Sequence, residues 1–310
     1  MRIVSLFSGI GGLDKGFVNQ GFDVVWANDF DKYAVETYRA NYNNEIVLGD
    51  INSIDLNNIP NFDVLIGGFP CQPFSMMGEK KGFNDARGTL FFRIVEIIQH
   101  RILNGHRPRA IVLENVRNLK THDQGRTFAV IQSILENDLR YKVFFKILNS
   151  ADYGVPQTRN RTYIVCFANQ DAEFSFPQKH ELSLTLQDLL QDDVDKKYFL
   201  SEKILPTILS NGTGGYVAKS EIDLKIARPL CASMAKMHRA CQDNYVTQKG
   251  KIRRLTPREC ARLQGFSDDF IIPVSDTQAY KQFGNAVTVN VSDAVACEVR
   301  RTLQQLGEWY

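Results

Sequence analysis

The first half of the chain alternates short apolar runs with segments whose apolar residues recur at helical spacing. Apolar runs of this length predict strands buried on both faces, and the periodic segments between them, such as residues 90–98, predict helices. Two further runs, residues 141–148 and 161–168, follow closely on one another and predict a terminal antiparallel pair. The pattern therefore predicts an α/β fold with a doubly wound, mostly parallel sheet and one antiparallel strand. The parallel strands are expected at residues 3–7, 24–27, 45–48, 64–66 and 110–113.

The pattern changes after residue 168, where proline, glycine, serine and charged residues are mixed up to about residue 253. This mixture predicts a second, smaller and irregular domain with short strands and long loops. A helix is expected to begin with Thr256 as its N-cap and Pro257 at its first position. Residues 285–306 are expected to form one last helix that returns to the first domain, because valines recur there at every fourth position.

The chain has 310 residues, a formal net charge of +2 and six scattered cysteines. Without a CxxC pair, these cysteines argue against a disulfide framework or a zinc knuckle, and we expect no metal. The chain lacks an apolar run of about 18 residues and enters a strand pattern at once, so we expect neither a membrane span nor a signal peptide. The composition therefore predicts a cytoplasmic protein without a membrane partner.

Positive charge is concentrated between Arg228 and Arg262, a segment that contains nine basic residues and two acidic residues, Asp243 and Glu259. This local charge of +7 in a nearly neutral chain indicates a candidate phosphate-binding face. A solvated charged surface would give the same composition.

The first expected strand leads into a glycine-rich turn at residues 8–13, which a helix follows. Such a turn lets a ligand approach the backbone, but its glycine spacing differs from the dinucleotide fingerprint GxGxxG. Asp29 ends the second strand, where it can accept hydrogen bonds from ribose hydroxyls, and Asp50 ends the third, where it can receive an adenine amino group. Each acid alone could instead cap a helix. Together they indicate a nucleoside pocket without a phosphate cradle, which fits S-adenosylmethionine better than a nicotinamide dinucleotide.

A thiol stands just beyond the fourth expected strand. That strand is expected to stop at two glycines, and Cys71 follows between Pro70 and Pro73, which stiffen the loop on either side. Open α/β sheets carry their chemistry at the carboxyl ends of strands, so Cys71 is a candidate nucleophile. Glu114 ends the neighbouring fifth strand and should emerge at the same edge, where desolvation suits a carboxyl group to act as an acid.

Two arginines, Arg159 and Arg161, are spaced to lie on one side of an extended chain. Their guanidinium groups offer planar donors for a carbonyl oxygen or a phosphate. Glu114 could instead cap a helix, and the arginines could form surface ion pairs. A thiol, an acid and a guanidinium gathered at strand ends nevertheless indicate an active site.

These motifs resemble those of the cytosine-5 DNA methyltransferases of the bacterial restriction-modification type. They occur in the family's order and cover nearly the whole chain outside residues 169–251. The matching segments are residues 7–12, 70–72, 114–116, Gln157 with Arg159 and Arg161, 254–262 and 278–287. The resemblance implies an S-adenosylmethionine-dependent methyltransferase fold. Residues 1–168 and 276–310 would form its catalytic domain, and residues 169–275 a target-recognition domain with its hinge.

The resemblance also implies a mechanism on a cytosine that is flipped out of double-stranded DNA. Cys71 would add to ring carbon 6, and Glu114 would stabilise or protonate ring nitrogen 3. Arg161 would hold the cytosine carbonyl oxygen, and Arg159 would help to order the site. The positions that match the S-adenosylmethionine pocket are Phe7, Gly9, Gly11, Leu13, Asp29, Asp50, Ile51, Pro70, Leu90, Asn285 and Val287.

By the same resemblance, the loop at residues 74–89 closes over DNA, and its glycines and cations suit a hinge and phosphate contacts. The roles of Met77 and Cys231 stay open, because the family places a small polar residue near the first and a threonine at the second. Arg228 and Arg239 are candidates for reading guanine. The residues expected at DNA are Ser75, Met77, Lys80, Lys81, Arg87, Gln157, Thr213, Gly214, Gly215, Arg228, Cys231, Arg239 and Arg258.

The expected biological setting is a monomer in the bacterial cytoplasm, associated with the nucleoid and paired in function with a cognate restriction endonuclease. A tRNA-methylating relative is an alternative, although its usual Cys-Phe-Thr signature is absent from the sequence. A catalytically silent DNA-binding relative is disfavoured by the presence of both Cys71 and Glu114. An unrelated nucleotide-dependent oxidoreductase would leave the thiol unexplained.

Overall fold

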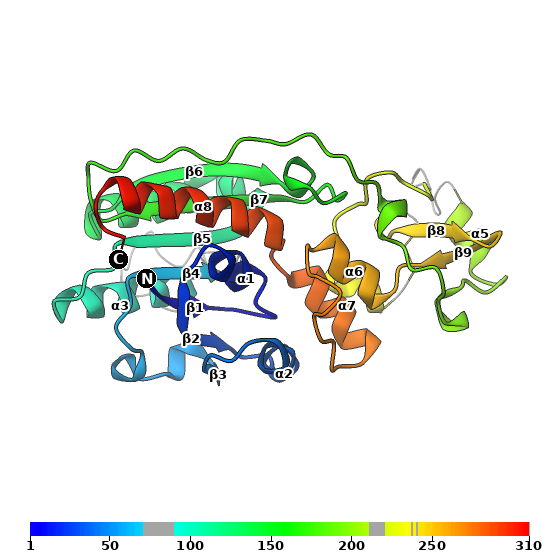
Figure 1. Cartoon of the computed structure of the whole chain (residues 1–310), viewed down its shortest axis with the longest axis horizontal. Coiled ribbons are helices and arrows are strands. Elements are labelled where there is room, and N and C mark those ends of the chain that lie inside the picture. The colour runs from blue at the N-terminus through cyan, green and yellow to red at the C-terminus, as the bar shows by residue number, and fades with distance from the viewer. Residues whose placement is uncertain (71–89, 211–220, 237, 240, 310) are drawn as a thin grey trace. The chain divides into compact units, whose positions relative to one another are not determined.

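The computed structural model describes residues 1–70, 90–210, 221–236, 238–239 and 241–309. Its contacts divide the chain into two compact units (Figure 1). Unit 1 comprises Met1–Leu148, Asn160–Gln178 and Ser292–Tyr310, and unit 2 comprises Asn149–Arg159 and Lys179–Val291. This division differs from the domain boundaries expected from the sequence, because residues 149–159 and 276–291 join unit 2. The functional division into catalytic and recognition domains stays a prediction.

A seven-stranded sheet in the order β3-β2-β1-β4-β5-β7-β6 forms the centre of unit 1. Strands β1 to β5 run parallel to one another, whereas β7 pairs with β5 in the antiparallel direction. The predicted fold class is thereby confirmed, and β6 and β7 lie side by side at one edge. The strands are β1 (Arg2–Leu6), β2 (Asp23–Asp29), β3 (Ile46–Leu48), β4 (Val64–Gly68), β5 (Ala110–Val116), β6 (Lys142–Asn149) and β7 (Asn160–Phe167).

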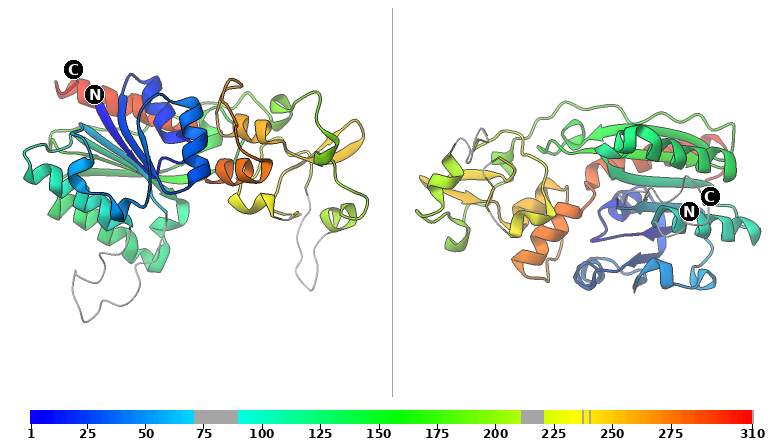
Figure 2. Two further views of the ribbon diagram at one scale, coloured as in Figure 1. Left: turned by 90° about the horizontal axis from the view of Figure 1, so that it is seen from below. Right: turned by 180° about the vertical axis from the view of Figure 1, so that it is seen from behind.

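Helices cover both faces of this sheet (Figure 2). On one face, Phe91 and Ile94 of α3 and Ile131 of α4 join the buried core with Leu65 of β4. On the other face α1 approaches α8 so closely that a Cβ at Gly16 would lie 2.4 Å from the backbone nitrogen of Asp293. The helices are α1 (Gly12–Asn19), α2 (Lys32–Asn41), α3 (Leu90–Leu103), α4 (Arg126–Ser133) and α8 (Val289–Gln305). Among the described residues, no helix is long and apolar enough to cross a membrane.

Three expectations about element ends are wrong. Strand β4 does not stop at the glycines but runs through Gly67 and Gly68, because their backbones pair with β5. Strand β3 ends at Leu48, and Asp50 instead caps a short 3-10 helix (Ile51–Ser53) by accepting a hydrogen bond from the Asn52 amide. The last helix, α8, begins at Val289 and not at Asn285, because the backbone leaves the helical conformation at Ala286, just after helix α7 (Asp276–Asn285).

Within its described residues, unit 2 contains a two-stranded antiparallel sheet and three complete α-helices, besides short 3-10 helices. They are α5 (Leu205–Leu209), β8 (Tyr245–Gln248), β9 (Lys251–Arg254), α6 (Pro257–Leu263) and α7 (Asp276–Asn285). The predicted start of α6 is confirmed, since the Thr256 side chain accepts from the Glu259 amide and Pro257 opens the helix.

A buried ion pair anchors α6 to the hairpin of unit 2. Arg253 and Glu259 have fully buried side chains and form a bidentate pair, with nitrogen–oxygen distances of 2.7 and 2.8 Å. The Glu259 carboxylate also accepts from the backbone amides of Thr256 and Gln191, each at 2.8 Å. Every charge-bearing group of this pair is therefore compensated inside the unit.

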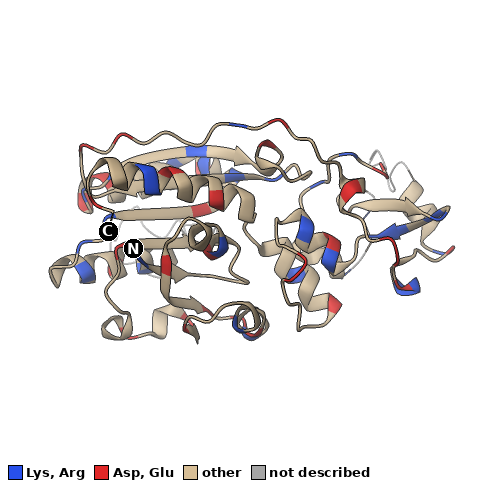
Figure 3. Cartoon of the chain, in the orientation of Figure 1, with Lys and Arg blue, Asp and Glu red and all other residues tan. Residues whose placement is uncertain are grey.

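The expected phosphate-binding face is partly neutralised within unit 2, where acidic residues lie among the basic ones (Figure 3). Besides Arg253, four of the nine cations of residues 228–262 form ion pairs with carboxylates. Their partners include Glu221, Asp193 and Asp268, which lie outside residues 228–262. The local excess of +7 therefore overstates the charge that this segment offers to a phosphate.

We expect Glu259→Gln to lower the free energy of unfolding by about 3 kcal/mol, because it leaves the buried Arg253 guanidinium without its counter-charge. Lys249→Ala is the matched control, since its ion pair with Asp193 joins side chains that are 72% and 96% exposed. The control should change stability by less than about 0.5 kcal/mol. Urea unfolding followed by circular dichroism measures both, and equal effects would contradict the assignment of Arg253–Glu259 as the anchor.

Candidate active site

The glycine-rich turn after β1 has a backbone shape that its neighbours fix. Gly9 and Gly11 have positive φ angles of 56° and 80°. The Tyr42 hydroxyl donates to the Gly11 carbonyl at 2.8 Å, and a Cβ at Gly11 would lie 2.4 Å from the Tyr42 ring. Glycine is therefore required at position 11 by both the backbone angle and the packing.

Asp29 ties the end of β2 to this turn. One of its carboxylate oxygens accepts from the Gly9 amide and the other from the Asp31 amide, both at 2.8 Å. Burial of this carboxylate raises its pKa, although the two amide donors counteract part of the shift. The acid that the sequence placed beside the turn thus helps to build it.

A cavity of about 260 Å³ opens beside the turn at the carboxyl ends of the parallel strands. It combines aromatic rings with amide and carboxylate groups, a donor set that suits the adenosine part of S-adenosylmethionine. The lining residues are Phe7, Asn28, Phe30, Gly49, Asp50, Ile51, Asn52 and Leu90. The structure thereby brings together Phe7, Asp50, Ile51 and Leu90 of the expected cofactor residues.

Sequence reasoning missed four residues of this lining, of which Phe30 is the most informative. Its side chain is 74% exposed although it is a large aromatic, and it directly follows Asp29. An aromatic residue next to a strand-end acid was the available signal, because exposed rings can stack on a base. Asn28, Gly49 and Asn52 gave no such signal; the Asn28 side chain donates to the carbonyls of Val47 and Gly49.

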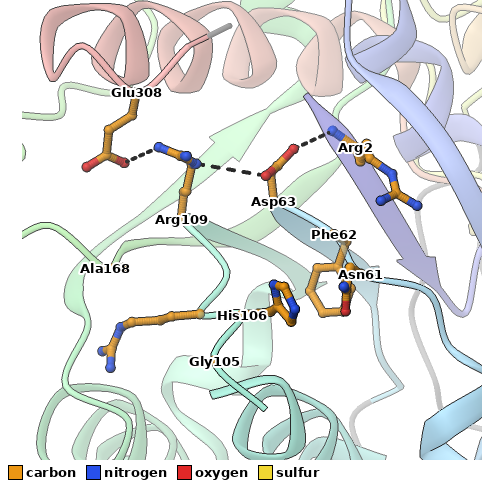
Figure 4. Close-up of a pocket in the computed structure, with 10 residues that line it drawn as sticks. Arg2, Asn61, Phe62, Asp63, Gly105, His106, Arg109, Ala168 and Glu308 are labelled. Carbon is orange, nitrogen blue, oxygen red and sulfur yellow. Dashed lines mark hydrogen bonds and ion pairs between the residues drawn. The ribbon is translucent and has the colours of Figure 1, made fainter. Parts of the chain in front are cut away.

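A second cavity, of about 540 Å³, lies at the opposite, amino-terminal edge of the sheet (Figure 4). There Arg109 lies between Asp63 and Glu308, at 3.8 and 3.7 Å, and the Arg2 amide donates to Asp63 at 2.8 Å. These contacts tie the carboxyl-terminal segment to the start of β1 and β5. The larger cavity is therefore at the edge away from the strand ends where α/β proteins bind their ligands.

Glu114 lies at the carboxyl end of β5 and is paired in register with Gly68 of β4. Its side chain is 9% exposed, and Arg161 of the adjacent β7 places its Nε 3.1 Å from the carboxylate. The next residue, Asn115, donates from its side chain to the Phe69 carbonyl at 2.8 Å. These contacts fix the acid and the chain that leads towards Cys71 at one sheet edge.

Arg159 and Arg161 serve different partners. Arg159 is 2% exposed and donates to three carbonyls of unit 2, those of Leu230, Gly284 and Ala286, at 2.9–3.0 Å. Its guanidinium thus fastens α7 to the segment before Cys231. Arg161 belongs to unit 1 and pairs with Glu114.

Gln157 lies inside unit 2, and its contact with DNA stays a prediction. Its side chain is fully buried, donates to the Leu263 carbonyl at 2.7 Å and accepts from the Leu230 amide at 2.9 Å. Both ends of the amide are occupied, so it positions the backbone near Leu230.

Among the described residues of unit 2, three other expected DNA contacts, Arg228, Arg239 and Arg258, have partners within the unit. Arg228 pairs with Glu221 at 3.0 Å, and Arg239 with Asp243 at 2.9 Å. Cys231 is half-buried. Arg258 donates to the Phe270 carbonyl at 2.7 Å. A DNA contact by these arginines would have to share or replace these bonds.

The remaining expected residues lie elsewhere in unit 1, in unit 2 or outside the described residues. Leu13 is buried with its carbonyl accepting from Ser292, and Pro70 is exposed at the end of the described segment. Asn285 and Val287 belong to unit 2. Cys71, Ser75, Met77, Lys80, Lys81, Arg87, Thr213, Gly214 and Gly215 lie outside the described residues.

Comparisons with known proteins agree on one family. The model of the C-5 cytosine-specific DNA methylases matches residues 1–301. The Type II methyltransferase M.NlaX of Neisseria lactamica is 42% identical over 99% of this chain and 98% of its own length. M.SsoII of Shigella sonnei is 43% identical over 97% of this chain and 80% of its own length.

Solved structures share the fold at lower identity. The Dnmt2 methyltransferase of S. pombe superposes with a TM-score of 0.78 at 20% identity, covering 99% of both chains. The methyltransferase EhMeth of Entamoeba histolytica superposes with a TM-score of 0.76 at 22% identity, covering 99% of this chain and 98% of its own.

We expect Gly11→Ala to weaken S-adenosylmethionine binding at least ~tenfold, because the new methyl group meets the Tyr42 ring and the left-handed backbone costs about 1–2 kcal/mol. Isothermal titration calorimetry gives the dissociation constants. The same substitution is also measured in a Tyr42→Ala background. There Gly11→Ala should weaken binding less, because the ring that the new methyl group would meet is absent. An equal loss in both backgrounds would contradict the packing argument.

Proposed function

This chain belongs to the C-5 cytosine-specific DNA methylase family, and from this premise we propose how its residues divide the work of methylation. It is a DNA (cytosine-5)-methyltransferase, and its methyl donor is S-adenosylmethionine, the cofactor of that family. The main observation in support of these proposed roles is that Gly68 of β4 is paired in register with Glu114 of β5. The Arg161 guanidinium forms an ion pair with the Glu114 carboxylate.

Cys71 is the proposed nucleophile. Carbon 5 of cytosine is unreactive, so the thiolate adds to carbon 6, and the ring becomes an enamine that is nucleophilic at carbon 5. A free thiol has a pKa of about 8.5, so a cationic neighbour would favour the thiolate. Once carbon 5 has accepted the methyl group, its proton would pass to a base or to water. The electron pair of that C–H bond would then form the double bond between carbons 5 and 6 and expel the thiolate from carbon 6, which restores the aromatic ring. The target must leave the stacked duplex for this chemistry.

Glu114 is the proposed partner of ring nitrogen 3, where negative charge gathers as the thiolate adds. A carboxyl group can stabilise that nitrogen by donating a proton or a hydrogen bond to it. Arg161 holds this carboxylate through its Nε, and its guanidinium has further N–H groups that suit the cytosine carbonyl oxygen. Arg159 would help to order the site, and it donates to the carbonyls of Leu230 and Gly284 within unit 2.

Phe7, Asp29, Asp50, Ile51 and Leu90 are the proposed holders of the cofactor, with Phe30 added from the lining of the cavity. When bound, S-adenosylmethionine supplies the electrophilic methyl group that carbon 5 accepts. The rings suit the adenine base, and the carboxylates suit ribose hydroxyls and the adenine amino group. Gly9, Gly11 and Leu13 shape the turn, while Pro70, Asn285 and Val287 complete the pocket in this proposal.

Residues 169–275 are proposed as the target-recognition domain on double-stranded DNA. Arg228 and Arg239 are its candidates for reading guanine, and Arg258 and Cys231 for backbone contacts. The loop residues Ser75, Met77, Lys80, Lys81 and Arg87 would meet the strand from which the cytosine leaves. Sequencing of 5-methylcytosine in plasmid DNA from an expressing host reads the recognition motif directly.

The biological setting follows by analogy with the relatives, which are named Type II methyltransferases. We propose a cytoplasmic, nucleoid-associated monomer whose methylation protects DNA from a cognate restriction endonuclease. Host DNA cleaved by a co-encoded nuclease only in the absence of this chain would support that setting.

We expect Cys71→Ala to abolish transfer of tritiated methyl groups to DNA while DNA binding survives, because only the nucleophile is removed. Cys297→Ala is the matched control, since Cys297 is an exposed free thiol at the far end of the chain. The control should retain wild-type activity. Comparable activity in Cys71→Ala would refute the proposed role, and methylation of tRNA in preference to DNA would refute the assigned substrate.

A further inference from the structure

Asp14 is a buried carboxylate that the proposed mechanism does not use. It occupies the first turn of α1, directly after the glycine-rich turn, and its side chain is fully buried. The hydroxyls of Ser5 and Tyr38 each donate to it at 2.7 Å. Ser8 in turn donates to the Ser5 hydroxyl at 2.8 Å, so the network reaches the first residue of the turn.

Charge compensation of this carboxylate is incomplete. Among the described residues its side-chain hydrogen-bond donors are two hydroxyls, and neither carries a positive charge. The titratable groups that interact with it are Asp29 on β2, Tyr38 on α2 and Tyr42 at the end of α2. The start of α1 contributes a partial positive charge, which favours an anion there.

Burial raises the pKa of Asp14 to about 6 from the ordinary 3.8, against the opposing hydrogen bonds of Tyr38 and Ser5. Because the folded-state pKa is the higher one, the fold loses stability as the pH rises from about 4 to about 6. Above that window the protein carries an ionised carboxylate at a net cost to its stability. A role of this charge in ligand binding would explain why the fold keeps a carboxylate that lowers its stability.

The bound methyl donor has a positively charged sulfur, and the product left after transfer has a neutral one. The Asp29 carboxylate accepts a hydrogen bond from Gly9 in the glycine-rich turn. Asp14 directly follows the turn in the chain and is linked back to the turn by the hydrogen bonds of Ser5 and Ser8. Neither carboxylate lines the cavity itself. A negative charge buried near a binding site nevertheless favours a cationic ligand over a neutral ligand of the same shape, because little solvent screens it.

We propose that Asp14 is a positioning residue whose negative charge makes the pocket bind S-adenosylmethionine in preference to S-adenosylhomocysteine. This inference rests on the proposed cofactor site beside the glycine-rich turn. It adds a role in product release, since the pocket loses an electrostatic attraction once the methyl group has been transferred.

The test compares the dissociation constants of both ligands by isothermal titration calorimetry on the full chain at pH 8. Asp14→Asn should lower the preference for S-adenosylmethionine about three- to tenfold, chiefly by weakening that ligand. Tyr38→Phe is the matched control, because it removes one hydrogen bond from the network and leaves the charge. It should leave the preference unchanged at pH 8. Equal weakening of both ligands by Asp14→Asn would reduce Asp14 to a purely structural role and overturn the proposal.

A pH series on the wild-type protein provides a second measurement that does not require Asp14→Asn to fold. The preference should fall as the pH drops through about 6, where Asp14 takes up a proton. Tyr38→Phe should shift that midpoint upward, since the Tyr38 hydroxyl lowers the pKa of Asp14. A preference that stays constant from pH 8 to pH 5 would overturn the proposal. Binding of S-adenosylmethionine by the wild type tests the cofactor site itself, independently of this ratio.

Discussion

The parallel register of β4 against β5 is the constraint on which the rest of the candidate site depends. It sets Gly68 opposite Glu114, so the chain that continues to Cys71 leaves the sheet beside the acid. Asn115 reinforces the arrangement by bonding the Phe69 carbonyl. The same edge carries the glycine-rich turn after β1 and the end of β2. A nucleophile, an acid and a cofactor pocket can meet there because parallel strands all end at one edge.

Buried charge recurs through the molecule, and it is compensated in three different ways. Arg253 and Glu259 neutralise each other completely, which stabilises unit 2. Glu114 is paired with Arg161 and keeps slight exposure, which suits the contact with the base that we propose for it. Among the described residues, the side chains that donate to Asp14 carry hydroxyls and no positive charge, and its remaining charge acts on the cofactor in our account. The degree of compensation thus follows the work proposed for each group.

The sheet and its reactive edge could be predicted from the sequence, because apolar runs and strand-end residues are local signals. These local signals could not show which residues distant in the chain would form hydrogen bonds or ion pairs with a given side chain. Gln157 is buried because Leu263 and Leu230, distant in the chain, occupy both ends of its amide. The basic segment is partly neutralised by acids outside it, such as Glu221. Phe30 was missed because an exposed aromatic has no periodic signature.

The most direct test of the central claim, that Cys71 attacks the base at this sheet edge, uses duplex DNA with 5-fluorocytosine at the methylated position. Fluorine cannot leave as a proton, so the covalent intermediate should accumulate when S-adenosylmethionine is saturating. Protease digestion and mass spectrometry should then locate the DNA on the peptide that contains Cys71. The absence of an adduct, or an adduct on any of the other five cysteines, would contradict the account.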